Sequence, residues 1–331
     1  MSMGAGKMVE RCPVMPAIAA IDPPMKRQPG LVIASYATIY LVWGSTYFFI
    51  RQSVLTIPPM WVMAIRWLIG GALLLGFSAV RGGLKKLPSV RNILSAVVLG
   101  TLLLLAGNGG ITIAELHVDS YVAALLASST PIIVAVFDSL LLRKPLTAAR
   151  ILGVVFGFAG VAVLLYNGQS LATSLNASVL IGLGGVLCWG LATSLGHRFP
   201  VSGDNTVNSG IQMLFVGIVS LLVCAVIGPA PGAVLKAASV LSLVGVLYLG
   251  VIGSAAFSAY TYLVGVEPAE RVVSYALVNP LIALVLGLWL AAEVPTPFLA
   301  LGVTLALIGL GFMLYGERLV AWLRSKARTK T

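Results

Sequence analysis

Residues 31–50, LVIASYATIYLVWGSTYFFI, form an uncharged and largely apolar run. A helix crosses the hydrocarbon core of a bilayer with about 20 such residues. Nine comparable runs follow, at about 60–80, 92–113, 120–142, 148–166, 177–197, 206–227, 238–263, 271–291 and 297–316. The gaps between them are short, and many contain proline or glycine. The sequence therefore predicts an all-α integral membrane protein with ten transmembrane helices.

The composition supports a membrane protein and argues against a soluble one. Hydrophobic residues make up 59% of the 331 residues, charged residues 9%, and the mean hydropathy is +1.03. Soluble domains carry roughly 25% charged residues, so this chain has too few to cover a water-facing surface. A net charge of +11 could indicate a nucleic-acid partner, but the basic residues lie in short connections and at the termini. We expect the lipid bilayer as partner and no nucleic acid.

The placement of basic residues also predicts the orientation. With the N-terminus in the cytoplasm, every Lys and Arg lies on the cytoplasmic side except Arg51, Lys236 and the intramembrane Arg66. By the positive-inside rule, both termini are then cytoplasmic. Residues 1–30 are rich in proline and predict a disordered cytoplasmic tail, or an overlong start, and 317–331 predict a basic cytoplasmic tail.

The chain contains an internal repeat. Trp43-Gly44 and Trp189-Gly190 lie 146 residues apart, as do Arg66 and Gln212, whereas Thr130-Pro131 and Asn279-Pro280 lie 149 residues apart. Each half, 31–166 and 177–316, holds five predicted spans. Because five is odd, the second half enters the membrane from the opposite side, which makes the repeat inverted. Secondary transporters use such repeats to alternate between inward-open and outward-open states around a central site.

Several motifs keep the order and spacing of a known family. They are Tyr40-Leu-Val-Trp-Gly-Ser-Thr-Tyr-Phe-Phe-Ile-Arg51, Pro58-Pro59, Arg66-Trp67, Gly107-Asn108-Gly109, Ala114-Glu115, Ala123-Ala124-Leu125-Leu126, Thr130-Pro131, and Ser274-Tyr275-Ala276-Leu277-Val278-Asn279-Pro280 with Glu293. Over about residues 31–316 the chain resembles EamA-type carriers of the drug/metabolite transporter superfamily, in particular the YedA-like bacterial exporters. The resemblance implies ten helices, one EamA domain in each half, and a central cavity that exports amino acids or other small organic molecules across the inner membrane. One departure is Lys144, which stands where the family usually has a glutamate.

Eight residues are candidates for the lining of that cavity. They are Trp43, Tyr47, Arg66, Asn108, Trp189, Gln212, Tyr275 and Asn279. Arg66 is the most informative, because an arginine inside an apolar span costs at least a few kcal/mol. It would attract a carboxylate or polar substrate, or else it would reach outward to the interface or to loop carbonyls. The aromatic residues would stack on a substrate or anchor the helices at the interface.

Local helix irregularities mark the same region. Asn108 lies between two glycines, which indicates an irregular helix where carbonyls are exposed to a cavity, or a packing position. Pro131 and Pro280 occupy matching places in the two halves and indicate broken helices near a binding site, or simple kinks. The rows Gly153-Gly157-Gly160 and Gly302-Ala306-Gly309 predict close helix packing.

Few other polar residues indicate chemistry. Asp138 would pair with Arg143 or Lys144 at the cytoplasmic interface, or carry protons. Glu115, His117 and Asp119 would form a solvated outer loop, or His117 would sense protons. The three cysteines, Cys12, Cys188 and Cys224, lack metal-binding spacing and are expected to be packing residues. Catalytic motifs in a supporting context are missing, so we expect no enzyme, no metal and no cofactor.

These observations lead to one functional hypothesis and its rivals. The chain is predicted to be a secondary transporter that exports a small metabolite, an amino acid or an amphipathic drug-like compound, by alternating access. Proton coupling and facilitated diffusion are both compatible with the sequence, and no particular oligomeric state is predicted. An importer of the same fold and a channel are the alternatives.

Overall fold

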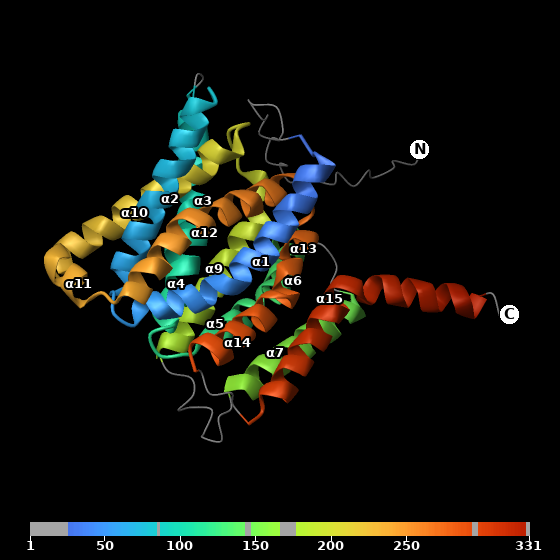
Figure 1. Ribbon diagram of the computed structural model, residues 1–331. Coiled ribbons are helices and arrows are strands. Elements are labelled where there is room, and N and C mark those ends of the chain that lie inside the picture. Colours follow the sequence, from blue (N-terminus) through green and yellow to red (C-terminus); the bar gives the residue numbers. More distant parts are fainter. Residues whose placement is uncertain (1–25, 85–86, 143–146, 166–176, 293–296, 329–331) are drawn as a thin grey trace, which may run out of the picture.

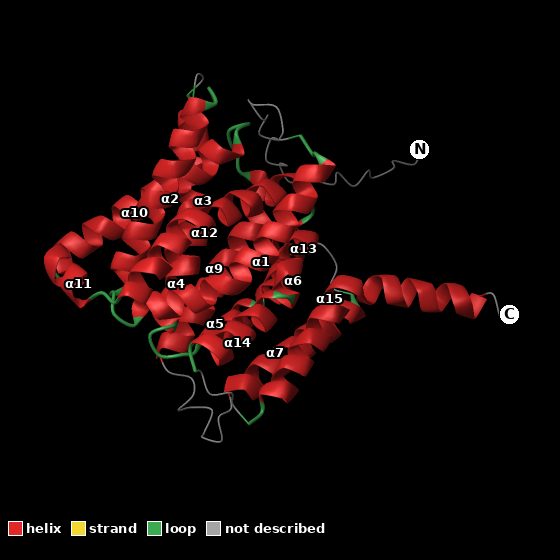
Figure 2. Ribbon diagram, in the orientation of Figure 1, coloured by secondary structure: helices red, strands yellow, loops and turns green. Residues whose placement is uncertain are grey.

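The computed structural model describes residues 26–84, 87–142, 147–165, 177–292 and 297–328. All regular elements in these ranges are helices (Figure 2). Cys12, Arg143, Lys144 and Glu293, which are named above, lie outside these ranges, as does residue range 1–25.

The first half of the chain forms seven α-helices and one π-helix. Their bounds are α1 Pro29–Val54, α2 Pro59–Val80, α3 Val90–Gly100, the π-helix η1 Thr101–Asn108, α4 Gly109–Ala114, α5 Ser120–Ala127, α6 Thr130–Leu142 and α7 Ala148–Leu165. Helix starts follow the local sequence. Proline occupies the first turn of α1 and α2. At the start of α3 the Ser89 side chain accepts a hydrogen bond from the backbone N–H of Asn92.

The second half forms seven α-helices and two 3₁₀ helices among its described residues. Its elements are α9 Ala177–Leu195, the 3₁₀ helix η2 Gly196–Arg198, α10 Asn205–Ile227, α11 Pro231–Ala237, α12 Val240–Val266, α13 Ala269–Val272, the 3₁₀ helix η3 Val273–Leu277, α14 Asn279–Leu290 and α15 Leu299–Arg328. The expected tail from residue 317 is helical as far as Arg328, because α15 continues through it. The last part of α15 projects away from the other helices (Figure 1).

Eight helical stretches among the described residues are long and apolar enough to cross a membrane. They are Pro29–Val54, Pro59–Val80, Val90–Ala114, Ser120–Leu141, Ala177–Leu195, Asn205–Ile227, Val240–Val266 and Val273–Leu290. They coincide with eight of the predicted spans. The other two predicted spans correspond to α7 and α15. Within α15, Leu299–Gly309 is a shorter apolar stretch. The helical membrane class is thus confirmed, and the count of ten spans stays a prediction.

Helix packing follows the same pattern when the two halves are exchanged. In the first half, α1 packs on α12 and α14; in the second, α9 packs on η1 with α4, and on α6. The second helices α2 and α10 contact each other, and so do the last helices α7 and α15 (Figure 1). The halves are therefore interleaved, because helices of each half pack on helices of the other.

Glycines allow the closest of these approaches. A Cβ on Gly44 of α1 would lie 2.7 Å from the Ile282 Cβ on α14, and one on Gly190 of α9 would lie 3.2 Å from the Ile133 Cβ on α6. The predicted glycine rows meet in the same way, since a Cβ on Gly160 would lie 2.8 Å from the Gly302 carbonyl oxygen. These rows therefore join α7 to α15 within one chain.

Three spans are irregular near the middle of the bundle. The helix that contains Asn108 is a π-helix over Thr101–Asn108, which agrees with the predicted irregularity. Turns separate α5 from α6 at Ser128–Ser129 and η3 from α14 at Val278. Pro131 and Pro280 each stand second in the helix that follows, where proline needs no hydrogen-bond partner for its nitrogen.

The two ends of the bundle are held by different contacts. At the end where α1 begins, here called the Arg27 end, Arg27 Nε donates to Glu267 Oε1 at 2.7 Å. At the end where α1 stops, here called the Thr56 end, Thr56 Oγ1 donates to Ser242 Oγ at 2.8 Å, and Ser242 Oγ donates to the Gln52 carbonyl at 2.6 Å. Charged groups thus join α1 to the end of α12 at one end, whereas neutral hydroxyls join α1 to the start of α12 at the other.

The structure decides one of two expectations for acidic residues. Glu115 is expected in a solvated loop, which is wrong, because its side chain is fully buried where α4 places it inside the bundle. Asp138 on α6 is buried against α9 and accepts a hydrogen bond from Ser194 Oγ, and its expected partners Arg143 and Lys144 lie outside the described residues. His117 is exposed, and its Nδ1 hydrogen-bonds Ser178 Oγ at 2.8 Å.

The contact between α7 and α15 provides a test of the packing. We expect Gly160→Leu to lower the free energy of unfolding by about 1–3 kcal/mol, because the side chain must push α15 away. Thermal unfolding of the purified protein in detergent measures the change. Gly76→Leu is the matched control, because a Cβ on Gly76 meets no atom within 4 Å. Equal melting temperatures for the two variants would contradict close packing of α7 on α15.

Candidate functional site

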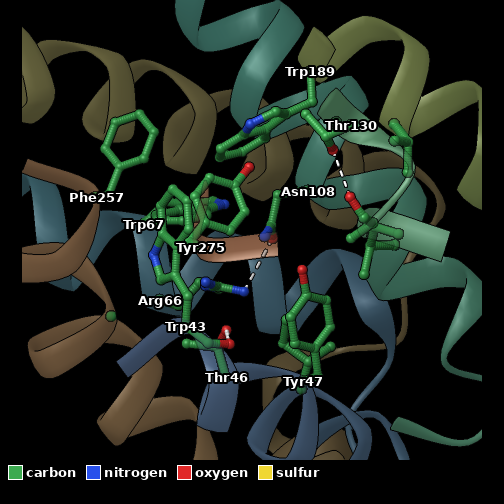
Figure 3. Close-up of a pocket in the computed structure, with 16 residues that line it drawn as sticks. Trp43, Thr46, Tyr47, Arg66, Trp67, Asn108, Thr130, Trp189, Phe257 and Tyr275 are labelled. Carbon is green, nitrogen blue, oxygen red and sulfur yellow. Dashed lines mark hydrogen bonds between the residues drawn. The ribbon is translucent and has the colours of Figure 1, made fainter. Parts of the chain in front are cut away.

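A cavity lies where helices of both halves meet. It encloses about 620 Å³ of space, its opening included. Residues of α1, α2, η1, α4, α5 and α6 line it from the first half, and residues of α9, α12 and η3 line it from the second (Figure 3). We call it the central cavity. Since neither half forms the wall alone, a change in how the halves pack would change its shape.

Aromatic rings form one wall of the central cavity. Trp43 on α1 and Trp189 on α9 meet edge to face with ring centroids 5.4 Å apart. Tyr275 on η3 meets Trp43 at 4.9 Å, and Tyr260 contacts both indoles at 4.9 and 5.2 Å. Such pairs contribute about 0.5–1.5 kcal/mol each beyond the area that they bury. The repeat-related tryptophans are therefore part of one packed cluster, with their glycine neighbours allowing the helices to come close.

Arg66 supplies the charge of the cavity. Its side chain lies on α2, the residue is only 2% exposed, and it lines the cavity. Its Nη1 donates to Asn108 Oδ1 at 3.0 Å, and its guanidinium carbon lies 4.1 Å from the centre of the Trp67 ring (Figure 3). The expectation that Arg66 reaches outward to the interface is thus wrong, because α2 turns it toward Asn108. Among the lining residues that the structure describes, Arg66 is the one with a formal charge.

The π-helix positions Asn108. Thr112 Oγ1 donates to the Asn108 carbonyl at 2.8 Å, which satisfies a backbone oxygen in the irregular stretch. A Cβ on the neighbouring Gly107 would lie 3.1 Å from the Trp189 ring. Glycine at 107 therefore leaves room for Trp189 beside Asn108, which accepts from Arg66. π-Helical turns of this kind are frequent at functional sites.

A buried carboxylate lies nearby, outside the cavity wall. Glu115 follows α4 and interacts electrostatically with Arg66. Its backbone carbonyl accepts a hydrogen bond from Arg51 Nη1. Glu115 is therefore joined to Arg51 through its carbonyl and interacts with Arg66 through its carboxylate.

The structure brings six of the eight predicted lining residues to the cavity. Trp43, Tyr47, Arg66, Asn108, Trp189 and Tyr275 line it. Gln212 and Asn279 do not. Gln212 is buried where α10 passes Gly100. The side-chain amide nitrogen of Asn279, in the orientation that satisfies its neighbours, donates to the carbonyls of Tyr40 and Tyr275 at 3.2 Å each. A substrate contact for all eight stays a prediction.

Sequence reasoning missed several lining residues, among them Thr46, Trp67, Thr130, Gly253 and Phe257. A signal for two of them was present. At the spacing of 146 residues that relates the Trp-Gly pairs, Gly253 and Phe257 correspond to Gly107 and Ile111, which line the same cavity. Gly107 and Ile111 were not among the eight candidates, so the repeat would have added both residues only after the cavity lining of the first half was known.

Comparison with known proteins agrees with the helical membrane fold. The EamA-like transporter family matches twice, at residues 30–166 and 176–315. The chain is 35% identical over 288 residues to a protein of Escherichia coli K12 named "Uncharacterized inner membrane transporter YedA", which covers 84% of this chain and 90% of that protein. It is 30% identical over 261 residues to "Protein PecM" of Dickeya dadantii, which covers 74% of this chain and 80% of that protein.

A solved structure shows the same fold. It is described only as "Crystal structure of protein", and it aligns with 88% of this chain and 100% of its own chain, at a TM-score of 0.65 and 19% sequence identity. The family matches cover most of the chain, and the two relatives named above share most of their length with it. The chain therefore belongs to the EamA-like transporter family.

Proposed function

We propose that this protein is a secondary transporter that exports a small amphipathic metabolite across the bacterial inner membrane by alternating access. The observation that carries the proposal is the central cavity, in which one buried guanidinium faces a wall of aromatic rings contributed by both halves. A cavity of this kind binds a molecule with one polar and one apolar part. Export, rather than import, rests on the resemblance to bacterial exporters.

The proposal includes ten spans arranged as an inverted repeat. The exchange-related packing of the helices supports it, because α1 contacts α14 as α9 contacts α6, and α2 and α10 contact each other. Two structurally similar halves can exchange their conformations, which opens the cavity alternately to the two sides. The proposed boundaries are 31–166 and 177–316 for the repeats.

The distribution of basic residues favours a cytoplasmic location for the Arg27 end. On α1 the cavity lining runs from Trp43 to Ile50, toward the Thr56 end. Tyr36 and Tyr40, closer to the Arg27 end, pack against the core cluster that contains Tyr260 and Tyr275. We infer that the structure represents a state closed to the cytoplasm, with the cavity on the outer side of the aromatic cluster.

Four contacts contribute to this closure. The Glu267 carboxylate, whose side chain is 3% exposed, accepts from Arg27 Nε at 2.7 Å and from Arg271 Nη1 at 3.3 Å. The Tyr40 and Ser274 hydroxyls hydrogen-bond at 2.6 Å, and the backbone N–H of Gln28 donates to the Tyr262 hydroxyl at 3.0 Å. In the proposed cycle these contacts break when the cavity opens inward. The Thr56 end would close at the same time.

A direct test of transport is export from cells that overproduce the protein. Mass spectrometry of the medium identifies any metabolite class that accumulates outside, and purified protein in liposomes shows whether external unlabelled compound drives exit of the labelled one. Such exchange and saturation are expected of a carrier. Flux that neither saturates nor exchanges would favour a channel, and accumulation inside cells would favour an importer.

The aromatic wall should be required for that export. We expect Trp43→Ala to lower the export rate about tenfold, because it removes a ring that contacts Trp189, Tyr260 and Tyr275. Export is compared at equal membrane abundance with Trp289→Ala, since Trp289 is 83% exposed on the outside of α14. Equal losses in both variants would argue against a substrate site beside Trp43.

The Glu267 ion pairs should bias the conformation. Because the arginines are about half-exposed, we assign the contacts roughly 1 kcal/mol, or about a fivefold population change. In a variant whose three cysteines are serine, Thr46→Cys provides a thiol in the cavity. We expect Glu267→Gln to slow labelling of that thiol by an impermeant reagent added outside. Arg27→Lys, which keeps the charge, should change the rate less, and faster labelling with Glu267→Gln would contradict closure at this end.

A further inference from the structure

The unsatisfied polar groups of the central cavity are hydrogen-bond donors. Arg66 Nε, Trp67 Nε1 and Trp189 Nε1 are buried and have no hydrogen-bond partner among the described residues. The Trp189 nitrogen lies near the Tyr260 and Tyr275 hydroxyls, without hydrogen-bond geometry. An unpaired buried donor is costly, and a ligand that brings acceptors removes that cost.

The orientation of Arg66 leaves one edge of its guanidinium for a ligand. Nη1 is committed to Asn108 at 3.0 Å, and the Trp67 ring covers one face at 4.1 Å. Nε and Nη2 lie on the other edge, and two parallel N–H groups match the two oxygens of a carboxylate. Nε is buried in this state, so a bidentate ligand must displace the neighbouring side chain that covers it. A Cβ on Gly253 would lie 4.0 Å from Nη2, so the missing side chain leaves space beside this edge.

The charge of the cavity favours an anion and disfavours an ammonium group. None of the described lining residues is an aspartate or glutamate. Glu115 lies outside the lining, so the formal charge that a ligand meets in the described cavity wall is that of Arg66. An ammonium group in the cavity would lose its water without gaining a carboxylate partner, which is costly in an apolar interior.

The aromatic wall sets the shape of the rest of the ligand. Trp43, Trp189, Tyr275 and Phe257 line the cavity together with Arg66. Pairs of these rings meet edge to face with centroids 4.9 to 6.4 Å apart, and a flat apolar body can pack against rings of this kind. A flat apolar body against these rings, with an acceptor group at Arg66, would satisfy both parts of the cavity.

We propose that the central cavity selects a monocarboxylate with an aromatic or similarly flat apolar body and no ammonium group, and that Arg66 binds its carboxylate. Under this proposal an aromatic acid is a better ligand than the corresponding aromatic amino acid. The proposal rests on the transport function inferred above and narrows its substrate class from amphipathic metabolites in general.

Four compounds with a common phenylalkyl skeleton test the charge requirement. They are 3-phenylpropionate, phenylalanine, 2-phenylethylamine and 3-phenylpropanamide, which are anionic, zwitterionic, cationic and neutral at pH 7. Because three tryptophans line the cavity, binding to the purified full-length protein is followed by tryptophan fluorescence. We expect saturable binding of 3-phenylpropionate, and at least about tenfold weaker binding of the other three. Equal binding of phenylalanine would overturn the exclusion of ammonium, and equal binding of the amide would overturn the role of the carboxylate.

Substitution of Arg66 links the charge requirement to this residue. Arg66→Gln should weaken 3-phenylpropionate at least about tenfold, and much more than it weakens the amide, whereas Arg66→Lys should retain part of the preference for the anion. Unchanged preference for the anion in Arg66→Gln would overturn the assignment. The comparison of the four compounds with the unaltered protein does not depend on how the variants fold.

Failure of this proposal and failure of the transport function give different results. If none of the four compounds binds while liposomes exchange other metabolites, the substrate class is wrong and the transporter stands. If 3-phenylpropionate binds to the protein but no compound is exchanged by liposomes, the site stands and the transport function is wrong.

Discussion

The close approach of helices from opposite halves is the constraint on which the rest of the structure depends. Gly44 on α1 lies against Ile282 on α14, and Gly190 on α9 lies against Ile133 on α6. In a bilayer the surrounding lipid is as apolar as the helix surfaces, so helix association relies on close packing of small residues. The adjacent Trp43 and Trp189 are thereby brought to 5.4 Å at the interface of the halves.

This interface tolerates polar groups that lipid would not. Arg66 is nearly fully buried, yet its charge meets Asn108, the Trp67 face and the field of Glu115. Charged residues inside membranes are costly and commonly serve function. The π-helix that presents Asn108 is placed beside α9, where the short Gly107 and Gly185 let the backbones approach. Packing and the polar site are thus built from the same residues.

The two ends of the bundle differ in how α1 is joined to α12. Ion pairs to Glu267 act at the Arg27 end, and hydroxyl contacts around Ser242 act at the Thr56 end. A carrier needs both closures to be of similar free energy, because a state that is favoured by several kcal/mol would hardly be left. Half-exposed arginines suit this requirement, since screening by water keeps their contribution small.

The sequence by itself determined the membrane class, the helix positions and most of the aromatic wall. Apolar runs longer than a bilayer, punctuated by proline and glycine, permit little other than helices, because backbone groups in lipid must be satisfied internally. The repeat of Trp-Gly then pointed to Trp43 and Trp189.

Only the tertiary structure decided which polar residues face the cavity. Gln212 matches Arg66 in the repeat yet lies outside it, and Glu115 is expected in water yet is buried. A helix that is apolar on all its faces has no sequence pattern that tells which face meets lipid, protein or a cavity. That choice is made by the packing of the other half.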